Sequence, residues 1–339
     1  MKTYNKRQPG GTSVWMMACL FFLLGFASCD YIHSDLPACK HTLSFIYTHN
    51  MKFADAFAHE MECQERTKQV DLYIYDEEGY FLSARTIAGE ELKANRIELD
   101  LQLGTYRLLA WAGLNDTDYT WETPAEGSKL SDFRMAVKQE KQIVDRELLG
   151  LFQGQLTLEI PEGGETHTDF PLVKDTNKLR FILIDTNTGT VLDVDDFQIR
   201  ATTTNGDLDA DNRPVSDTRL TWLPYYKGVQ QVASADGTSA YPAVCAELNT
   251  LRLIKGGKGT LHLRYAKDAA DFLAVDLADF LCLTQMESHK LDAQEYLDRQ
   301  DEYSILIYID LTGGKAHCLQ VIVNDWVIRL DDTDLKEEI

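Results

Sequence analysis

The run YSILIYIDL at residues 303–311 is followed by the run HCLQVIV at residues 317–323. Every second residue from Ile305 to Ile309 and from Leu319 to Val323 is apolar. A period of two places these side chains on one face of a β-strand. Thr312-Gly313-Gly314-Lys315 between the runs is a turn sequence, so the two runs predict a β-hairpin with one buried face.

The same pattern extends over most of the chain. Gln69–Tyr75 and Tyr80–Ile87 flank the turn Asp76-Glu77-Glu78-Gly79 and predict a second hairpin. Residues 114–132 are polar and predict a loop, and Ala293–Gln300 predicts a short helix. Short, regularly spaced strands are typical of β-sandwiches, so the predicted fold class is all-β with a few short helices. Further strands are predicted over residues 40–48, 95–103, 105–111, 151–160, 169–173, 179–184, 191–203, 220–226, 243–254, 259–265, 272–283 and 326–330.

The strands fall into two sets that are separated by Lys174-Asp175-Thr176-Asn177. A chain of 339 residues is long enough for two domains that each have a core. We therefore predict two β-sandwiches in tandem, an N-terminal one over residues 39–175 and a C-terminal one over residues 176–339. No alternation of strands with helices supports a parallel sheet.

The first 28 residues have the composition of a secretory signal peptide. They begin with three basic residues and no acidic ones, and an apolar run from Val14 then leads to the small residues Ala27 and Ser28. A membrane-spanning helix needs about 20 apolar residues, and this run is shorter. Residues 1–28 are therefore predicted to be a signal peptide.

The segment Phe26-Ala27-Ser28-Cys29 resembles a bacterial lipobox. In lipoproteins with this motif the Cys thiol receives a diacylglyceryl group, and the signal is cut just before the Cys. The resemblance predicts cleavage between Ser28 and Cys29, acyl chains on Cys29 and a lipidated tether over residues 29–38. Two or more acyl chains hold a protein on a bilayer. The alternative is a soluble secreted protein that is cut near Ser28.

The mature chain is strongly acidic. The full sequence holds 33 Lys and Arg against 54 Asp and Glu, and the signal peptide contains three of the basic residues and none of the acidic ones. This balance leaves no basic surface to neutralise phosphates, so nucleic acid is excluded as a partner. Anionic lipid would not attract the chain either, so membrane attachment depends on the acyl chains of Cys29.

No motif in the sequence predicts catalysis, a metal site or a cofactor. The acidic residues of 207–211 have the spacing of a calcium loop, but Asn212 stands where an EF-hand needs Gly. We therefore predict a solvated hairpin tip there. The cysteines show no zinc-ligand spacing, and Cys39 with Cys63 is the only pair that we consider for a disulfide.

Several short motifs occur together in an order that is typical of one protein family. They are the lipobox, Cys39, LSFIY at 43–47 with Asn50, FAD at 53–55, LYIYDEEGYF at 72–81, GTY at 104–106, WAGL at 111–114, KDTN at 174–177, NG at 205–206, DN at 211–212, QEYLDR at 294–299 and NDW at 324–326. Through these motifs the mature chain resembles the FimB-type fimbrial anchor lipoproteins of Gram-negative anaerobes. Asp325 departs from the Gly that commonly precedes the Trp in that family.

The resemblance implies two transthyretin-like β-sandwich domains, attachment to the outer membrane through acyl chains on Cys29, and surface exposure as part of a fimbria. It implies a base subunit that attaches the fibre to the cell and limits its length. The partners would be fimbrial shaft or accessory subunits, which join by donating a β-strand to a sheet edge. The family brings no catalytic residues and no cofactor.

The partner strand is predicted at Trp326-Val327-Ile328-Arg329-Leu330, an extended apolar segment that could complete a neighbouring subunit. The alternative is that this segment closes the second sandwich of its own chain. A competing function class is a surface lipoprotein that binds glycan or peptide on the same scaffold. A row of exposed Trp or Tyr would favour such a binder, and Trp121, in the polar loop, is the candidate for such exposure.

Overall fold

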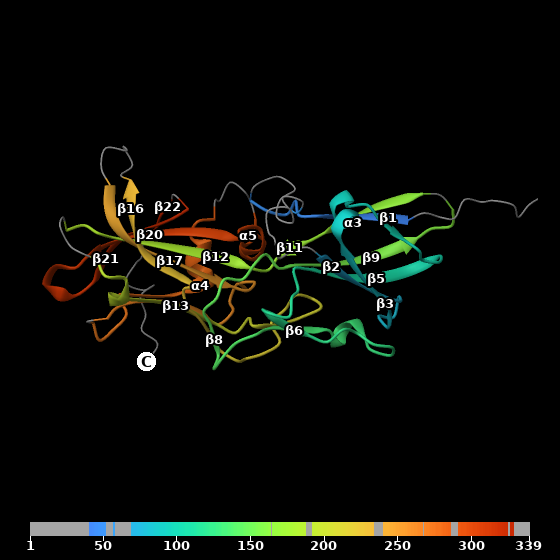
Figure 1. Ribbon diagram of the computed structural model, residues 1–339, viewed down its shortest axis with the longest axis horizontal. Coiled ribbons are helices and arrows are strands. Elements are labelled where there is room, and N and C mark those ends of the chain that lie inside the picture. Colours follow the sequence, from blue (N-terminus) through green and yellow to red (C-terminus); the bar gives the residue numbers. More distant parts are fainter. Residues whose placement is uncertain are drawn as a thin grey trace, which may run out of the picture.

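The computed structural model describes residues 41–51, 57, 69–163, 165–187, 192–233, 240–266, 268–285, 291–324 and 326–328. Most of the regular structure in these residues is β-strand, arranged in five sheets with a few short helices (Figure 1). The prediction of an all-β fold built from sandwiches is therefore confirmed.

The N-terminal sandwich packs a three-stranded sheet against a five-stranded sheet. Between them lie fully buried side chains such as Phe45, Phe170, Leu72 and Leu108. The rings of Phe45 and Phe170 are 5.5 Å apart between centroids. In spatial order the strands are β10 (Thr166–Pro171), β1 (His41–Ile46) and β4 (Ile97–Leu99), and then β11 (Val173–Lys174), β9 (Phe152–Ile160), β5 (Gly104–Ala112), β2 (Gln69–Tyr75) and β3 (Phe81–Ala88).

The five-stranded sheet is covered on both faces. Tyr73 and Trp111 point away from the N-terminal core because side chains alternate along a strand, and both are buried against Phe133. The ring centroids of Tyr73 and Trp111 lie 5.3 Å and 5.9 Å from that of Phe133. The cover is a small sheet of three strands, β14 (Asp207–Asp209), β7 (Arg134–Val137) and β6 (Tyr119–Trp121).

The prediction of a loop over residues 114–132 is wrong in part. The segment contains β6 and a short 3-10 helix over Leu130–Asp132, and Tyr119 and Leu130 are buried. Tyr119 and Leu130 are flanked by polar residues in the sequence, so no alternation of apolar residues indicates the strand.

The C-terminal sandwich packs a six-stranded sheet against a second five-stranded sheet. The hairpin predicted over residues 303–323 is confirmed, with Ile305 opposite Val323 and Ile307 opposite Val321 on the buried face. Two short helices belong to this half: α4 (Leu277–Cys282) packs against β18 and β19 of the five-stranded sheet, and α5 (Ala293–Arg299) packs against α4. The strands in spatial order are β16 (Tyr226–Ala233), β17 (Ala240–Thr250), β12 (Asn177–Asp185), β20 (Glu302–Asp310), β21 (His317–Val323) and β22 (Trp326–Ile328), and then β19 (Leu273–Asp276), β18 (Gly259–Tyr265), β13 (Phe197–Thr203), β15 (Leu220–Trp222) and β8 (Ile143–Val144).

Two details of the C-terminal half differ from the prediction. The strand expected over residues 272–283 ends at Asp276, whose carboxylate accepts a hydrogen bond of 2.8 Å from the N–H of Asp279 and starts α4.

β12 and β20 run parallel, as do β1 and β10, although no helix alternates with these strands. The chain between β12 and β20 contributes strands to the opposite sheet, which provides the long connection that a parallel pair needs.

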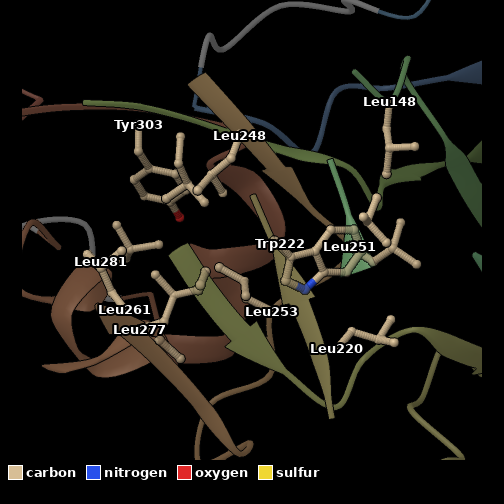
Figure 2. Close-up of a cluster of buried hydrophobic side chains, with 14 of the residues drawn as sticks. Leu148, Leu220, Trp222, Leu248, Leu251, Leu253, Leu261, Leu277, Leu281 and Tyr303 are labelled. Atoms are coloured by element: carbon tan, nitrogen blue, oxygen red, sulfur yellow. The ribbon is translucent and has the colours of Figure 1, made fainter. Parts of the chain in front are cut away.

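Trp222 lies at the centre of the C-terminal core. Its indole is fully buried and its Nε1–H donates to Thr203 Oγ1 at 2.7 Å, so the one polar group of the ring is satisfied. Figure 2 shows Leu148, Leu220 and Leu251 grouped around the ring. Leu148 precedes the predicted domain boundary in the sequence, so the N-terminal half supplies part of this core.

Strand pairs also cross the predicted boundary at 175/176. Thr221 of β15 pairs with Ile143 of β8, and Leu208 of β14 pairs with Met135 of β7. The domain boundary at 175/176 remains a prediction about which parts of the chain fold independently. The pairs show that β7 and β8 each pair with a strand that follows residue 176.

The segment Lys174–Asn177 is buried, although its sequence predicts a turn between domains. Lys174 Nζ contacts Asp301 Oδ2 at 2.7 Å, and both side chains are more than 90% buried. Asn177 Nδ2 donates to the carbonyl of Leu251 at 3.2 Å, and the main chain of Lys178 donates to the carbonyl of Asp301 at 2.8 Å. These bonds fasten the junction of the two sandwiches to the loop after β17 and to the start of β20.

Asp175 adds a buried carboxyl group to this junction. Asn212 Nδ2 donates to Asp175 Oδ1 at 2.7 Å, and the left-handed backbone of Asn212, with φ of 60°, turns its side chain inward. Asp175 Oδ2 and Asn212 Oδ1 are both buried acceptors without a donor. Burial raises the pKa of Asp175 to about 7, although the Asn212 bond and the positive charge of Arg252 oppose the rise. The protonated carboxyl group of Asp175 would itself be a hydrogen-bond donor.

We predict that Asp175→Asn makes stability less dependent on pH. The pKa of Asp175 is higher in the folded chain than in the unfolded one, so folding takes up a proton between about pH 4 and 7. The native chain therefore loses stability as pH rises through 7, and the neutral amide does not. Urea unfolding at pH 5 and pH 8 should show the variant gaining on the native chain at pH 8 by a few kcal/mol, since one pKa unit is about 1.4 kcal/mol.

The matched control for this measurement is Asp116→Asn, because Asp116 is exposed. It should leave the difference between the two pH values unchanged. If the native chain and the Asp175→Asn chain lose the same stability between pH 5 and pH 8, Asp175 is already ionised in the fold and the prediction is wrong.

A second prediction concerns the strand pairs that cross residue 175. When residues 30–175 and 176–339 are produced as separate pieces in one cell, we expect them to co-purify, because β7 and β8 pair with β14 and β15. Piece 176–339 alone should melt at a lower temperature than the intact chain, since it lacks Val144 and Leu148 of its core. Equal melting temperatures for that piece and the intact chain would contradict this role.

Candidate functional site

The candidate site for a partner strand is the edge of the six-stranded sheet at β22. Three residue pairs join β22 to β21, namely Val321 with Ile328, Ile322 with Val327 and Val323 with Trp326. No strand of the described chain pairs with the other side of β22. The main chain of an edge strand has N–H and C=O groups that can pair with an added strand.

The turn before β22 is built on Asn324. Its backbone has a left-handed φ of 47°, which Asn tolerates better than most residues. Its Oδ1 accepts from the N–H of Ser304 at 2.8 Å, and its own N–H donates to the carbonyl of Ser304 at 2.9 Å. These two bonds fasten the turn to β20, so β22 leaves β21 at a defined place.

Part of the predicted partner strand lies in the described chain. Trp326, Val327 and Ile328 form β22, and the side chain of Val327 is 56% exposed. Arg329 and Leu330 lie outside the described residues, as does Asp325 in the turn. The pairing with β21 agrees with a strand that closes its own sandwich. A role as partner strand stays a prediction.

The other predicted site residues are not described by the structure. Ser28 and Cys29 at the cleavage and lipidation site lie outside the described ranges. Cys39 and Cys63 do as well, so the disulfide between them stays a prediction. The three cysteines that are described, Cys245, Cys282 and Cys318, are free thiols.

The opposite edge of the six-stranded sheet is β16, which sequence reasoning did not single out. It is eight residues long and has one charged residue, Lys227, whose ammonium group donates to the carbonyl of Phe197 at 3.0 Å. Long edge strands are usually protected by charges, prolines or covering segments. By comparison, the edge strand β3 carries Arg85, which pairs with Glu91 of the helix α3 (Gly89–Ala94).

The described residues contain neither a metal-ligand group nor a membrane-spanning helix. Within them, no group of three or more His, Cys, Asp or Glu residues is placed to hold a metal ion. No helix of the described ranges is long and apolar enough to span a bilayer. Trp121, the candidate for an exposed aromatic platform, is partly buried against the main core.

Solved structures of several proteins share this fold. One from Bacteroides thetaiotaomicron, named as a candidate polysaccharide-binding protein, is 28% identical with a TM-score of 0.73 and matches 87% of this chain and 99% of its own. A candidate adhesin from the same organism is 27% identical with a TM-score of 0.76, over 88% of this chain and 100% of its own. The fimbrial anchor protein Mfa2 from Porphyromonas gingivalis is 15% identical with a TM-score of 0.63, over 86% of this chain and 98% of its own.

No curated protein sequence matches the chain significantly. The sequence profile of the fimbrillin-A associated anchor proteins Mfa1 and Mfa2 matches residues 36–332, which is nearly the whole chain after the predicted tether. The match agrees with the family that the sequence motifs resemble. The chain therefore belongs to the family of fimbrillin-A associated anchor proteins.

Proposed function

We propose that this protein is the lipid-anchored base subunit of a fimbria, which attaches the fibre to the outer membrane and limits its length. The family match over residues 36–332 carries the proposal. The match begins at residue 36, inside the predicted tether of residues 29–38, so the acyl chains on Cys29 would sit a few residues before the part of the chain that matches the family. Fimbrial shaft or accessory subunits would be its protein partners.

The architecture suits a part that bears load between a membrane and a fibre. The first described strand, β1, has a neighbour on each side, since it pairs with β10 and with β4. Beyond it, the buried ion pair of Lys174 with Asp301 and the strand pairs across residue 175 couple the two sandwiches. A pull on the tether would therefore act on both sandwiches together.

The fibre side of the proposal rests on strand pairing at β22. A strand from a neighbouring subunit could pair with the free side of β22, or Trp326–Leu330 could leave β21 and pair with that neighbour. Within the described residues, three residue pairs hold β22 in its own sheet. Such a short edge strand costs little to release, which supports exchange between subunits.

The competing hypothesis of a glycan- or peptide-binding lipoprotein uses the same scaffold and the same membrane anchor. One similar structure is named as a candidate polysaccharide-binding protein and another as a candidate adhesin. Anchoring and sugar binding would use different surfaces. We therefore treat anchoring as the main function.

Cys29→Ala should abolish acylation and release the protein from the membrane, because no other residue is proposed to carry acyl chains. The measurement is metabolic labelling with a palmitate analogue, followed by partition between detergent and aqueous phases. Cys39→Ala is the matched control and should keep both label and membrane attachment. Label on the Cys29→Ala protein would contradict the anchor mechanism.

Deletion of residues 326–339 should detach or lengthen the fibres while lowering the melting temperature by only a few degrees. The small thermal effect is expected because β22 is a three-residue edge strand. Deletion of residues 331–339 is the control and should leave fibres normal, since it keeps the whole predicted partner strand. Normal anchoring and fibre length in cells with the longer deletion would exclude a partner role for Trp326–Leu330.

A further inference from the structure

The strand β16 is a long edge with little protection against pairing. It forms one margin of the six-stranded sheet, and no strand of the described chain pairs with its outer side. Among the other described edge strands, β10 carries Asp169 and Pro171, β3 carries Arg85, and the rest are at most four residues long. Charges, prolines and short lengths discourage pairing with another chain. β16 has eight residues, no proline and a single charge.

The single charge of β16 is directed inward. Lys227 pairs with Ala246, which belongs to the main core, so its side chain lies on the core face of the sheet. Its ammonium group donates to the carbonyl of Phe197 in the opposite sheet at 3.0 Å. The lysine therefore links the two sheets of the sandwich and does not guard the outer side of β16.

The largest side chain of β16 lies along its own strand. A Cβ at position 228 would be 2.7 Å from the Tyr226 hydroxyl oxygen, so the Tyr226 ring extends over Gly228. Gln230 Nε2 donates to that hydroxyl at 2.8 Å. The ring follows the outer face of the strand and leaves the main-chain N–H and C=O groups at the edge accessible.

A row of core residues ends at an exposed valine on β16. Leu183 of β12 pairs with Val244 of β17, and Val244 pairs with Val229 of β16. Leu183 and Val244 are fully buried, whereas Val229 is 46% exposed. Paired residues lie on the same face of a sheet, so Val229 continues the core row to the open edge. An apolar residue on an added strand would cover Val229 and extend this row.

Apolar side chains are also exposed on the outer face near this edge. Tyr226 is 37% exposed, and Tyr241, which pairs with Val232 of β16, is 42% exposed. The edge therefore presents large apolar groups on both faces of the sheet. Such groups are typical of surfaces that contact another protein.

The charge of the chain favours a contact between copies at this edge. Residues 228–246, which run from β16 into β17, contain one charged residue, Asp236, although 26% of the chain is charged. The formal net charge is −21, so two copies repel each other over most of their surfaces. A nearly neutral edge is where this repulsion is smallest.

We propose that two copies of this chain pair through β16 and form a two-fold symmetric dimer. A two-fold axis sets the same strand of both copies side by side in antiparallel orientation. The core rows of the two copies then meet at Val229, and the two six-stranded sheets become one continuous sheet. The contact goes beyond anchoring and uses the edge opposite β22, so β22 stays free for a fimbrial partner.

The sequence of β16 is complementary to itself in one register. With the axis at Val229, seven of the eight residues pair and the exposed apolar groups meet apolar groups. With the axis at Gln230, seven residues also pair, but Val229 meets Gln231 and Tyr226 has no partner. Apolar cross-strand pairs stabilise a sheet, so the first register is favoured. Its pairs are Val229 with Val229, Tyr226 with Val232, Lys227 with Gln231 and Gly228 with Gln230.

Crosslinking of single cysteines tests this register. The protein is the full mature chain with its acyl chains, purified in detergent, and the reagent is a short bismaleimide. Directly paired residues have Cβ atoms about 5 Å apart, so Val229→Cys should give a crosslinked dimer. The two copies of residue 226 would lie about 20 Å apart along the strands, so Tyr226→Cys should not. Val215→Cys is the matched control, because Val215 is 45% exposed on another strand connection. The native chain gives the background from its own cysteines.

Charges at position 229 test whether the contact is between copies. Val229→Lys and Val229→Glu each set like charges face to face on the axis, so each should weaken dimerisation at least tenfold in sedimentation experiments. An equimolar mixture of the two variants should restore the dimer, because opposite charges then face each other. Val215→Lys should sediment like the native chain. Melting temperatures within a few degrees of the native value will show that each variant folds.

Four results would each overturn the proposal. They are a native chain that sediments as a monomer at micromolar concentration, a Val229→Lys chain that stays dimeric, a mixture of the Lys and Glu variants that stays monomeric, and a Tyr226→Cys chain that crosslinks as completely as Val229→Cys. Membrane attachment through Cys29 is measured separately by acyl labelling, so the dimer and the anchor can fail independently.

Discussion

Charged groups are buried where the two sandwiches meet, and the structure of this junction depends on how those groups are paired. A charge taken out of water costs several kcal/mol unless a partner compensates it. Lys174 has Asp301, and Arg252 forms two bonds of 2.7 and 2.8 Å with Asp298. Each pair joins residues that are far apart in the sequence. Lys174 and Asp301 lie on opposite sides of residue 175, so displacement of one sandwich against the other would leave these two buried charges without partners.

The long strands could be predicted from the sequence, and the short ones could not. β20 and β21 are long enough for an alternation of apolar residues to be recognised in the sequence, and the hairpin that they form is predicted correctly. β8 has two residues and β6 has three, so neither contains a period at all. These short strands are held by pairing with distant segments. Such tertiary pairing has no local signal in one sequence.

The candidate sites were predictable only where the signal is local. Val327 and its neighbours were recognised as an extended apolar segment, and the structure places them in β22. The partners of Asp175 were missed, because Asn212 looks like an ordinary turn residue until the fold brings it inward.

The cover on the N-terminal five-stranded sheet also sets an order of events during folding. β7 and β8 emerge from synthesis before β14 and β15, with which they pair. Until those partners arrive, Met135, Val144 and Leu148 have no main core to enter. Contacts between distant segments slow folding, and exposed apolar strands are prone to aggregate in that interval. A nascent chain of this protein therefore exposes these apolar residues until β15 has been made, and a chain that is truncated before β15 would keep an incomplete sheet.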